Sequence, residues 1–128
     1  MKLRIRGDSL RLRLTRSEIT RIGLGESVSE TTPFPEGAQF KYTLEPSLSA
    51  EAVTATYFDA QIKIGLPMNL ARTWAKSGEV AIQTQTDKLF ILIEKDFACL
   101  KPRENEKEDE SDMYFNPNSL TGHCGSHL

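Results

Sequence analysis

The segment KLRIRGDSLRLRLT, residues 2–15, decides the fold because it alternates apolar and basic side chains on both sides of a turn. The apolar set is Leu3, Ile5, Leu10, Leu12 and Leu14, and the basic set is Lys2, Arg4, Arg6, Arg11 and Arg13. Alternation with a period of two is typical of strands, and Gly7-Asp8 supplies a turn. The segment therefore predicts a β-hairpin with one aliphatic face and one arginine face.

The residues after this hairpin predict a short helix and then a second hairpin. Thr15 followed by Glu18 is typical of a capping box, and Ile19 and Ile22 have helical spacing before Gly23. Strands are expected around residue 28 and over residues 40–44, with a proline- and glycine-containing connection between them.

The second half of the chain runs through the same order of elements. We expect a strand at Val53–Phe58, a turn at Asp59-Ala60, and a strand with inward residues Ile62, Ile64 and Leu66. Pro67 opens a helix whose apolar stripe is Leu70 and Trp74, and Gly78 closes it. Val80 and Ile82 begin a last hairpin that returns over Lys88 to Glu94. The pattern predicts an α+β fold made of two tandem ββαββ units, at about residues 1–46 and 52–97; chance similarity of two small α+β halves is the alternative.

Length and composition fit one domain with a sizeable core. The chain has 128 residues, of which 38% are hydrophobic and 27% charged. No apolar run is long enough to span a membrane, and the alternating start does not resemble a signal peptide. The two cysteines are too few for a disulfide scaffold, so we expect reduced thiols and a cytoplasmic location.

The net charge of −2 conceals a gradient along the chain. Residues 1–25 carry a charge of +5, residues 26–93 carry −3, and residues 94–128 carry −4. A basic end attracts polyanions, and an acidic end can compete with them.

Two motifs occur at matching places in the two halves of the chain. The first is Arg6 to Thr15 with Gly25-Glu26, and the second is Ile64-Gly65-Leu66-Pro67 with Gly78-Glu79-Val80 and Leu89-Phe90-Ile91. Both resemble the swapped-hairpin domain of AbrB-type regulators and MazE-type antitoxins. The resemblance covers residues 2–94. It implies a small, mainly antiparallel β barrel in which the two units exchange hairpins with pseudo-two-fold symmetry, in tandem as in MraZ-type regulators. The whole chain also resembles a family of small uncharacterised bacterial proteins, through its MKLRIRG start and the segment Ile93 to Leu100.

The resemblance implies a non-enzymatic DNA-binding regulator or antitoxin-like module. Its basic surface corresponds to Arg6, Arg11 and Arg13, with Lys2 and Arg4 adjacent. Asp8 stands where antitoxins usually have Asn, Thr15 replaces their usual Pro, and the second unit offers only Lys63 on the matching strand. Arginine binds phosphate through a planar fork, and five neutralised phosphates would give a salt slope of about −4.5.

The same residues allow a competing interpretation as a structural or protein-interaction module with no DNA binding. In that case the basic face is solvated or neutralised by the chain's own acidic tail, in keeping with a pI of about 5.7. Residues 98–128 are expected to form an acidic, partly disordered tail that could bind a basic protein partner or anchor itself through Tyr114 and Phe115. The assembly is expected to be a monomer or a homodimer.

Metal binding and catalysis receive little support from the residues. Cys99, His123, Cys124 and His127 could supply four N/S ligands to zinc, but their spacing does not match common zinc modules, so no metal or cofactor is expected. No phosphate loop, nucleophile elbow or His-Glu-x-x-His motif occurs, and Glu94 with Asp96 is interpreted as the rim of a sheet. An anion-binding phosphohydrolase is the enzymatic alternative, and it would require inward arginines.

Overall fold

Alternating apolar residues form the first hairpin, as the sequence predicts. In the computed structural model, which describes residues 1–97, β1 spans Lys2–Arg6 and β2 spans Ser9–Leu14. Gly7 turns the chain with a φ of 56°, a conformation that suits glycine. Leu10, Leu12 and Leu14 are all buried, so the aliphatic face of β2 lies against the core.

Helix α1, Arg16–Gly23, begins at the predicted capping box. The Glu18 backbone N–H donates to Thr15 Oγ1 at 3.4 Å, and the Thr15 N–H donates to Glu18 Oε1 at 2.8 Å. These bonds satisfy two backbone donors that a helix start would otherwise leave without partners. Ile19 and Ile22 are buried, which confirms the predicted apolar face.

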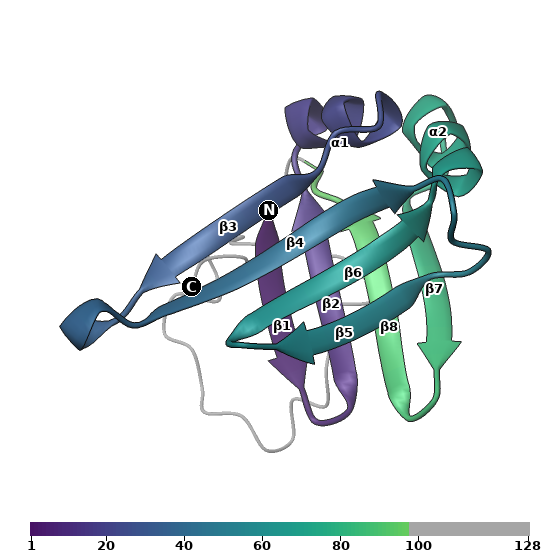
Figure 1. Ribbon diagram of the computed structural model, residues 1–128. Coiled ribbons are helices and arrows are strands. Elements are labelled where there is room, and N and C mark those ends of the chain that lie inside the picture. The colour runs from purple at the N-terminus through teal and green to yellow at the C-terminus, as the bar shows by residue number, and fades with distance from the viewer. Residues whose placement is uncertain (98–128) are drawn as a thin grey trace, which may run out of the picture. The chain divides into compact units, whose positions relative to one another are not determined.

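The remaining elements follow in the expected order (Figure 1). They are β3 (Val28–Pro33), a 3₁₀ turn (Pro35–Gly37), β4 (Gln39–Ser47), β5 (Thr54–Phe58), β6 (Gln61–Pro67), α2 (Met68–Lys76), β7 (Ala81–Thr86) and β8 (Leu89–Lys95). The predicted stripe of α2 is wrong at one position. Leu70 is exposed, and the buried face is formed by Met68, Ala71 and Trp74, at intervals of three residues.

The strands form two four-stranded mixed sheets. Sheet A has the order β1-β2-β8-β7 and sheet B has the order β3-β4-β6-β5. The four hairpins pair antiparallel, whereas β2 with β8 and β4 with β6 pair parallel. The fold is therefore α+β with mainly antiparallel pairing. No pairing among residues 1–97 joins the two sheets into a closed barrel, so that part of the prediction is not confirmed: each sheet ends in two strands that have one neighbour only.

Each sheet combines strands from both halves of the chain. The first hairpin lies beside the last hairpin, and the two middle hairpins, β3–β4 and β5–β6, lie beside each other. A strand's neighbour can therefore be about eighty residues away in the sequence.

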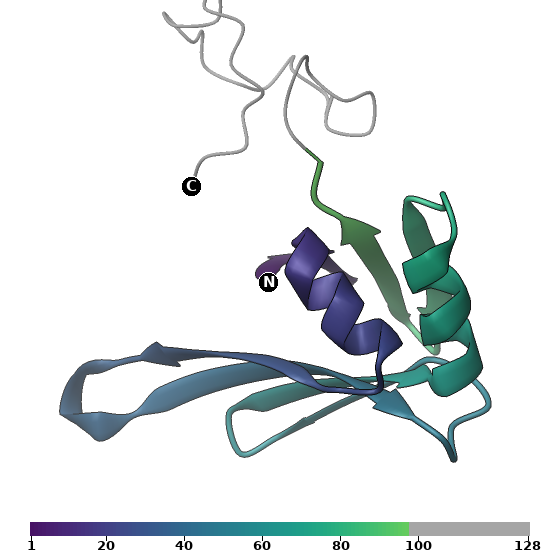
Figure 2. The ribbon, with the colours of Figure 1, turned by 90° about the horizontal axis from the view of Figure 1, so that it is seen from above.

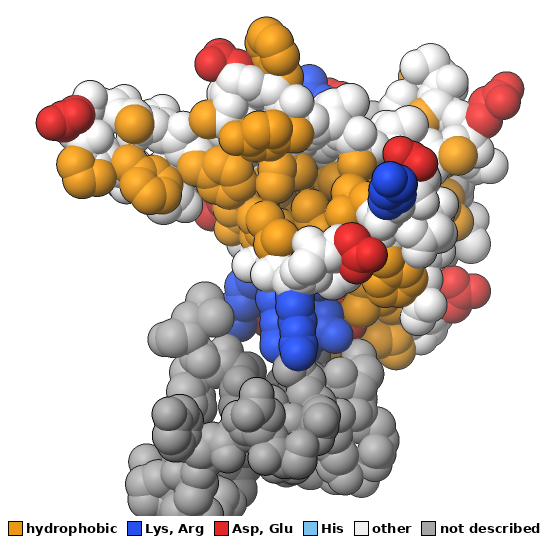
Figure 3. Space-filling model, turned by 90° about the horizontal axis from the view of Figure 1, so that it is seen from below, with side chains coloured by type: hydrophobic (Ala, Val, Ile, Leu, Met, Phe, Trp, Pro, Cys, Tyr) orange, Lys and Arg blue, Asp and Glu red, His pale blue; other side chains and the backbone are white. Residues whose placement is uncertain are grey.

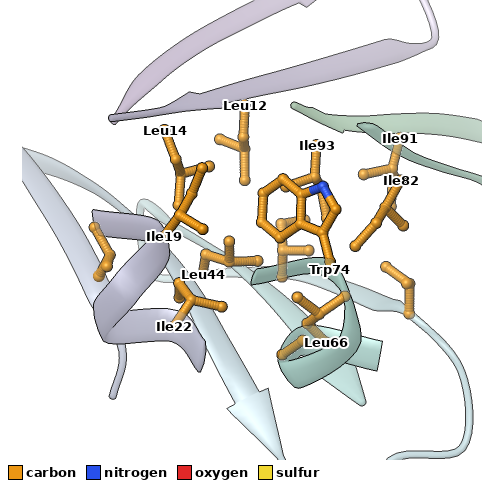
Figure 4. Close-up of a cluster of buried hydrophobic side chains, with 14 of the residues drawn as sticks. Leu12, Leu14, Ile19, Ile22, Leu44, Leu66, Trp74, Ile82, Ile91 and Ile93 are labelled. Atoms are coloured by element: carbon orange, nitrogen blue, oxygen red, sulfur yellow. The ribbon is translucent and has the colours of Figure 1, made fainter. Parts of the chain in front are cut away.

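The core lies between the sheets and under the helices. Figure 1 shows both helices at one end of the strands, and Figure 2 shows α1 and α2 side by side with sheet B running along one side of them. Trp74 of α2 lies among aliphatic side chains from both sheets and from α1 (Figure 4). Leu12 of sheet A and Ile64 of sheet B are 1% and 0% exposed within this one core.

The helices approach each other closely at one glycine. A Cβ added at Gly23 of α1 would lie 2.7 Å from the Cβ of Ala75 in α2, closer than two carbon atoms can approach. Gly23 therefore fixes the separation of the helices that cover the core.

Candidate nucleic-acid interface

The five basic side chains predicted to share one face come from opposed positions of β1 and β2. The register places Lys2 opposite Arg13 and Arg4 opposite Arg11. Alternation directs these side chains away from the leucines that fill the core. Like charges directly opposite one another on neighbouring strands are destabilising unless a counter-charge is near. The sequence prediction that these residues gather on one surface is thus consistent with the pairing of β1 and β2.

The two strands present their cations differently to solvent. Lys2, Arg4 and Arg6 of the edge strand β1 are exposed. On β2, the side chains of Arg11 and Arg13 are 19% and 10% exposed. The cations of edge strand β1 are therefore accessible to solvent, whereas those of β2, which lies between β1 and β8, are mostly buried.

Glu94 of β8 supplies the counter-charge for β2. Because β8 pairs parallel to β2 with Glu94 beside Arg13, the carboxylate lies on the same face as the arginines. Arg13 Nε donates a hydrogen bond to Glu94 Oε1 at 2.6 Å, and Arg11 Nε lies 3.5 Å from the same oxygen. Glu94 is 3% exposed, so its interpretation as a sheet rim is wrong: it lies between two arginines.

Three further observations describe the electrostatics of this face. Lys2 Nζ lies 3.4 Å from Asp96 Oδ2, with the lysine side chain half exposed. Arg11 Nη1 is buried and has no hydrogen-bond partner in the part of the chain that the structure describes. Figure 3 shows Lys and Arg side chains gathered next to a broad area of hydrophobic side chains.

A cluster at the N-terminus holds the start of β1. The Met1 ammonium lies 2.5 Å from Glu18 Oε2 and 3.1 Å from Glu30 Oε2, and the Tyr42 hydroxyl donates to the Met1 carbonyl at 3.0 Å. Partial burial alone would lower the pKa of the ammonium, but its bonds to Glu18 and Glu30 outweigh this and raise the pKa above 8.0. These contacts tie the basic strand to α1, β3 and β4.

The same cluster shifts the pKa values of its other members. Partial burial would raise the pKa of Glu18, but the bonds from the ammonium and from the Thr15 N–H lower it below 4.5. Burial, together with the negative charges of Glu30 and Glu18, raises the pKa of Tyr42 above 10.0. The ammonium and Glu18 are therefore both charged near neutral pH.

Sequence reasoning located the cations but missed how they are supported. Nothing local in the sequence links Glu94 to Arg13, because the two are 81 positions apart. The signal that was available is the alternation Leu92, Glu94, Asp96, which places two acids on one face of the last strand. Lys63 is exposed on β6, so the second unit contributes a single cation on its matching strand, as the sequence indicates.

The other candidate ligands lie elsewhere in the chain. Cys99, His123, Cys124 and His127, and the acidic segment with Tyr114 and Phe115, fall outside the described residues. Within residues 1–97, no group of three or more His, Cys, Asp or Glu side chains is arranged to hold a metal ion. The two helices described are also too short to cross a bilayer.

The fold and its surface define an α+β domain of two mixed sheets with a basic edge strand. The chain belongs to a family of unknown function, DUF7009, whose model matches residues 1–118. This agrees with the resemblance of the whole chain to small uncharacterised proteins. No curated protein and no solved structure matches the chain.

Proposed function

We propose that this protein is a non-enzymatic DNA-binding module that contacts the duplex backbone through the exposed cations of β1. Lys2, Arg4 and Arg6 would bind phosphates directly because their side chains are exposed, and Lys2 would exchange Asp96 for a phosphate. Arg11 and Arg13 would contribute through the electrostatic potential of the surface, because their side chains are mostly buried beside Glu94. The observation that carries the proposal is the concentration, among residues 1–97, of five cations and two acids, Glu94 and Asp96, on one face of sheet A.

The geometry of a pleated strand suits this role. Alternate residues of β1 are about 6 to 7 Å apart, which is close to the spacing of phosphates along one DNA strand. Arginine can bind each phosphate with two parallel hydrogen bonds. Within the described residues, β1 is an edge strand with β2 as its one strand neighbour, so a long polymer can run along its other side.

The proposal includes the architecture implied by the resemblance to AbrB-type and MazE-type proteins. We infer that the chain consists of two tandem ββαββ units that have exchanged hairpins around a pseudo-two-fold axis, in a barrel-like arrangement. Strand order supports this: renaming β1–β4 as β5–β8, and the reverse, converts the order of sheet A into that of sheet B. Parallel pairing also occurs at equivalent places, β2 with β8 and β6 with β4.

Fluorescence anisotropy with a labelled DNA duplex at low salt tests the proposed contact. Arg4→Glu and Arg6→Glu should weaken binding, because each replaces a phosphate-binding cation with an anion. Lys63→Glu, which makes the same change of charge on exposed β6, is the matched control and should have a smaller effect. Equal effects of Arg4→Glu and Lys63→Glu would show that binding depends on net charge alone and would refute the proposed surface.

A second candidate is a structural or protein-interaction module without DNA binding. It is favoured by the internal pairing of Lys2, Arg11 and Arg13 with Asp96 and Glu94, which reduces the charge available to a polyanion. Absence of any salt-dependent binding at micromolar protein would support it. Co-purification of a small basic protein with the full chain would instead support the antitoxin-like variant, in which the acidic tail takes the partner.

Removal of residues 101–128 provides a further test of the DNA-binding proposal. If the acidic tail competes with DNA for the basic face, the shortened chain should bind DNA more tightly. Unchanged or weaker affinity would exclude this competition.

A further inference from the structure

In the part of the chain that the structure describes, strand β5 forms a sheet edge without the usual protecting residues. It lies at the end of sheet B, where its only strand neighbour among residues 1–97 is β6. Its sequence, TATYF, contains no charged residue, no proline and no glycine. Natural proteins usually protect such edges with charges, prolines or bulges, because an open edge can pair with another strand. The edge strand β1 has three cations, and β3 has Glu30 and ends at Pro33. The fourth edge strand, β7 (AIQTQT), also lacks charge, proline and glycine, but unlike β5 it has no aromatic side chain.

Two large aromatic side chains on β5 are exposed. Tyr57 is 69% exposed and Phe58 is 82% exposed, and alternation places them on opposite faces of the sheet. Tyr57 shares its face with Ile62, the residue directly opposite on β6, which belongs to the core. An edge that combines open backbone groups with exposed aromatic residues is a site for association.

The hairpin register shows which backbone groups of β5 face outward. Phe58 and Gln61 are the paired residues on either side of the two-residue turn. The Ala60 carbonyl accepts a hydrogen bond from the Lys41 N–H of β4 and therefore points to β4. Because the direction of the backbone groups alternates along a strand, the N–H and C=O groups of the next residue, Gln61, point to β5. Antiparallel pairs alternate in the direction of their backbone groups. Thr54, Thr56 and Phe58 therefore direct their N–H and C=O groups to β6, and Ala55 and Tyr57 direct theirs to the open edge.

This pattern is self-complementary in one register. We propose that two copies of the chain associate through antiparallel pairing of β5 with β5, with Thr56 on the two-fold axis. Ala55 of one copy then faces Tyr57 of the other, so each outward N–H and C=O group meets a partner. All five residues of the strand are paired, and the two sheets B join into one continuous sheet.

The side chains fit the same register. Each Tyr57 ring lies across from the small Ala55 of the other copy, and each Phe58 lies across from Thr54, so no two large rings collide. Registers displaced by two residues leave part of the five-residue strand unpaired. A displacement by one residue would place the core face of one copy beside the solvent face of the other.

Sedimentation of the full chain across a concentration series tests this pairing. The native chain should shift from monomer to dimer as the concentration rises. Thr56→Glu should weaken dimerisation by at least about tenfold, because two carboxylates would then meet at the axis. Within one copy the new carboxylate faces Lys63, its partner on β6, so the fold should be retained. Gln83→Glu, the same charge change on the exposed face of edge strand β7, is the control and should leave dimerisation unchanged.

Disulfide trapping gives an independent readout in a chain with Cys99→Ser and Cys124→Ser. At the axis the two Thr56 positions form a non-hydrogen-bonded pair, with Cα atoms about 4.5 Å apart, a separation that a disulfide can bridge. Thr56→Cys should form a covalent dimer on oxidation. The two copies of residue 54 would be about 14 Å apart, so Thr54→Cys should not form one. A chain that stays monomeric at high concentration, equal effects of Thr56→Glu and Gln83→Glu, or equal trapping by both cysteine variants would overturn the proposal.

Discussion

Replacement of Glu94 by Gln should destabilise the fold strongly, although the change removes only a charge. The carboxylate lies 2.6 Å from Arg13 Nε and 3.5 Å from Arg11 Nε, and its side chain is 4% exposed. Removing one partner of a buried ion pair takes the close counter-charge away from the other, at a cost of about 3–5 kcal/mol. Because Arg11 is partly exposed, we expect the lower end of that range, about 3 kcal/mol.

Urea unfolding monitored by the fluorescence of Trp74 measures this loss. Trp74 is the only tryptophan of the chain and is 1% exposed, so its emission reports exposure of the core. With an m-value of about 1.5 kcal/mol/M, a loss of 3 kcal/mol lowers the midpoint by about 2 M.

Glu26→Gln is the matched control for Glu94→Gln. Glu26 pairs with Arg21 at 3.3 Å, but both side chains are more than half exposed, so the expected loss is at most about 1 kcal/mol. Adding Arg13→Met to Glu94→Gln should restore part of the stability, because it removes a buried charge that Glu94 no longer neutralises. Similar midpoints for Glu94→Gln and Glu26→Gln would refute the reasoning.

Three further substitutions test the packing, a turn and the N-terminal cluster. Gly23→Ala should lower the free energy of unfolding by about 1–2 kcal/mol, because the new Cβ would meet Ala75. Gly78→Ala, where the new Cβ meets no atom within 4 Å, should be tolerated, and equal unfolding midpoints for the two variants would contradict the close helix contact. Ala60→Gly should stabilise the fold by about 0.5–1 kcal/mol, because residue 60 has a φ of 58°, which glycine adopts more easily than alanine. Ala38→Gly, at an ordinary φ of −69°, should destabilise the fold instead, and a loss of stability in Ala60→Gly would contradict the prediction. Glu18→Gln should lower the free energy of unfolding by about 1 kcal/mol near pH 7. The difference in that free energy between the variant and the native chain should become smaller above pH 8.0 and below pH 4.5.

The pH dependence of that last prediction follows from the directions of the two pKa shifts. The raised pKa of the Met1 ammonium contributes stability that is fully present below pH 8.0 and is lost as the pH rises through the folded-state value. The lowered pKa of Glu18 contributes stability that is present above pH 4.5 and is lost as the pH falls through its folded-state value. A constant difference between Glu18→Gln and the native chain from acid to alkaline pH would exclude this ion pair as the cause.

The sequence predicts most elements of this fold because their signals are local. The alternation in residues 2–14 identifies the first hairpin, and Thr15 with Glu18 identifies the start of α1. The pattern places Leu70 on the wrong face because a short helix allows more than one apolar stripe. Ala71, which forms part of the buried face, is too small to give a strong signal.

The pairing between the halves of the chain could not be predicted from local patterns. Parallel pairing of β2 with β8 is determined by packing over the shared core, and the sequence contains no turn that specifies it. The candidate site, too, is predictable only where its residues are close in sequence. The cations of β1 and β2 follow from alternation, whereas the position of Glu94 between Arg11 and Arg13 depends on the register of two distant strands.

The salt dependence of DNA affinity tests the proposed role of β1 most directly. If Lys2, Arg4 and Arg6 each neutralise one phosphate, the logarithm of the binding constant should fall with the logarithm of salt concentration with a slope of about −2.7. Arg4→Ala should reduce the magnitude of that slope by about 0.9, and Lys63→Ala should leave it unchanged. A slope near zero, or one that Arg4→Ala does not alter, would contradict the account.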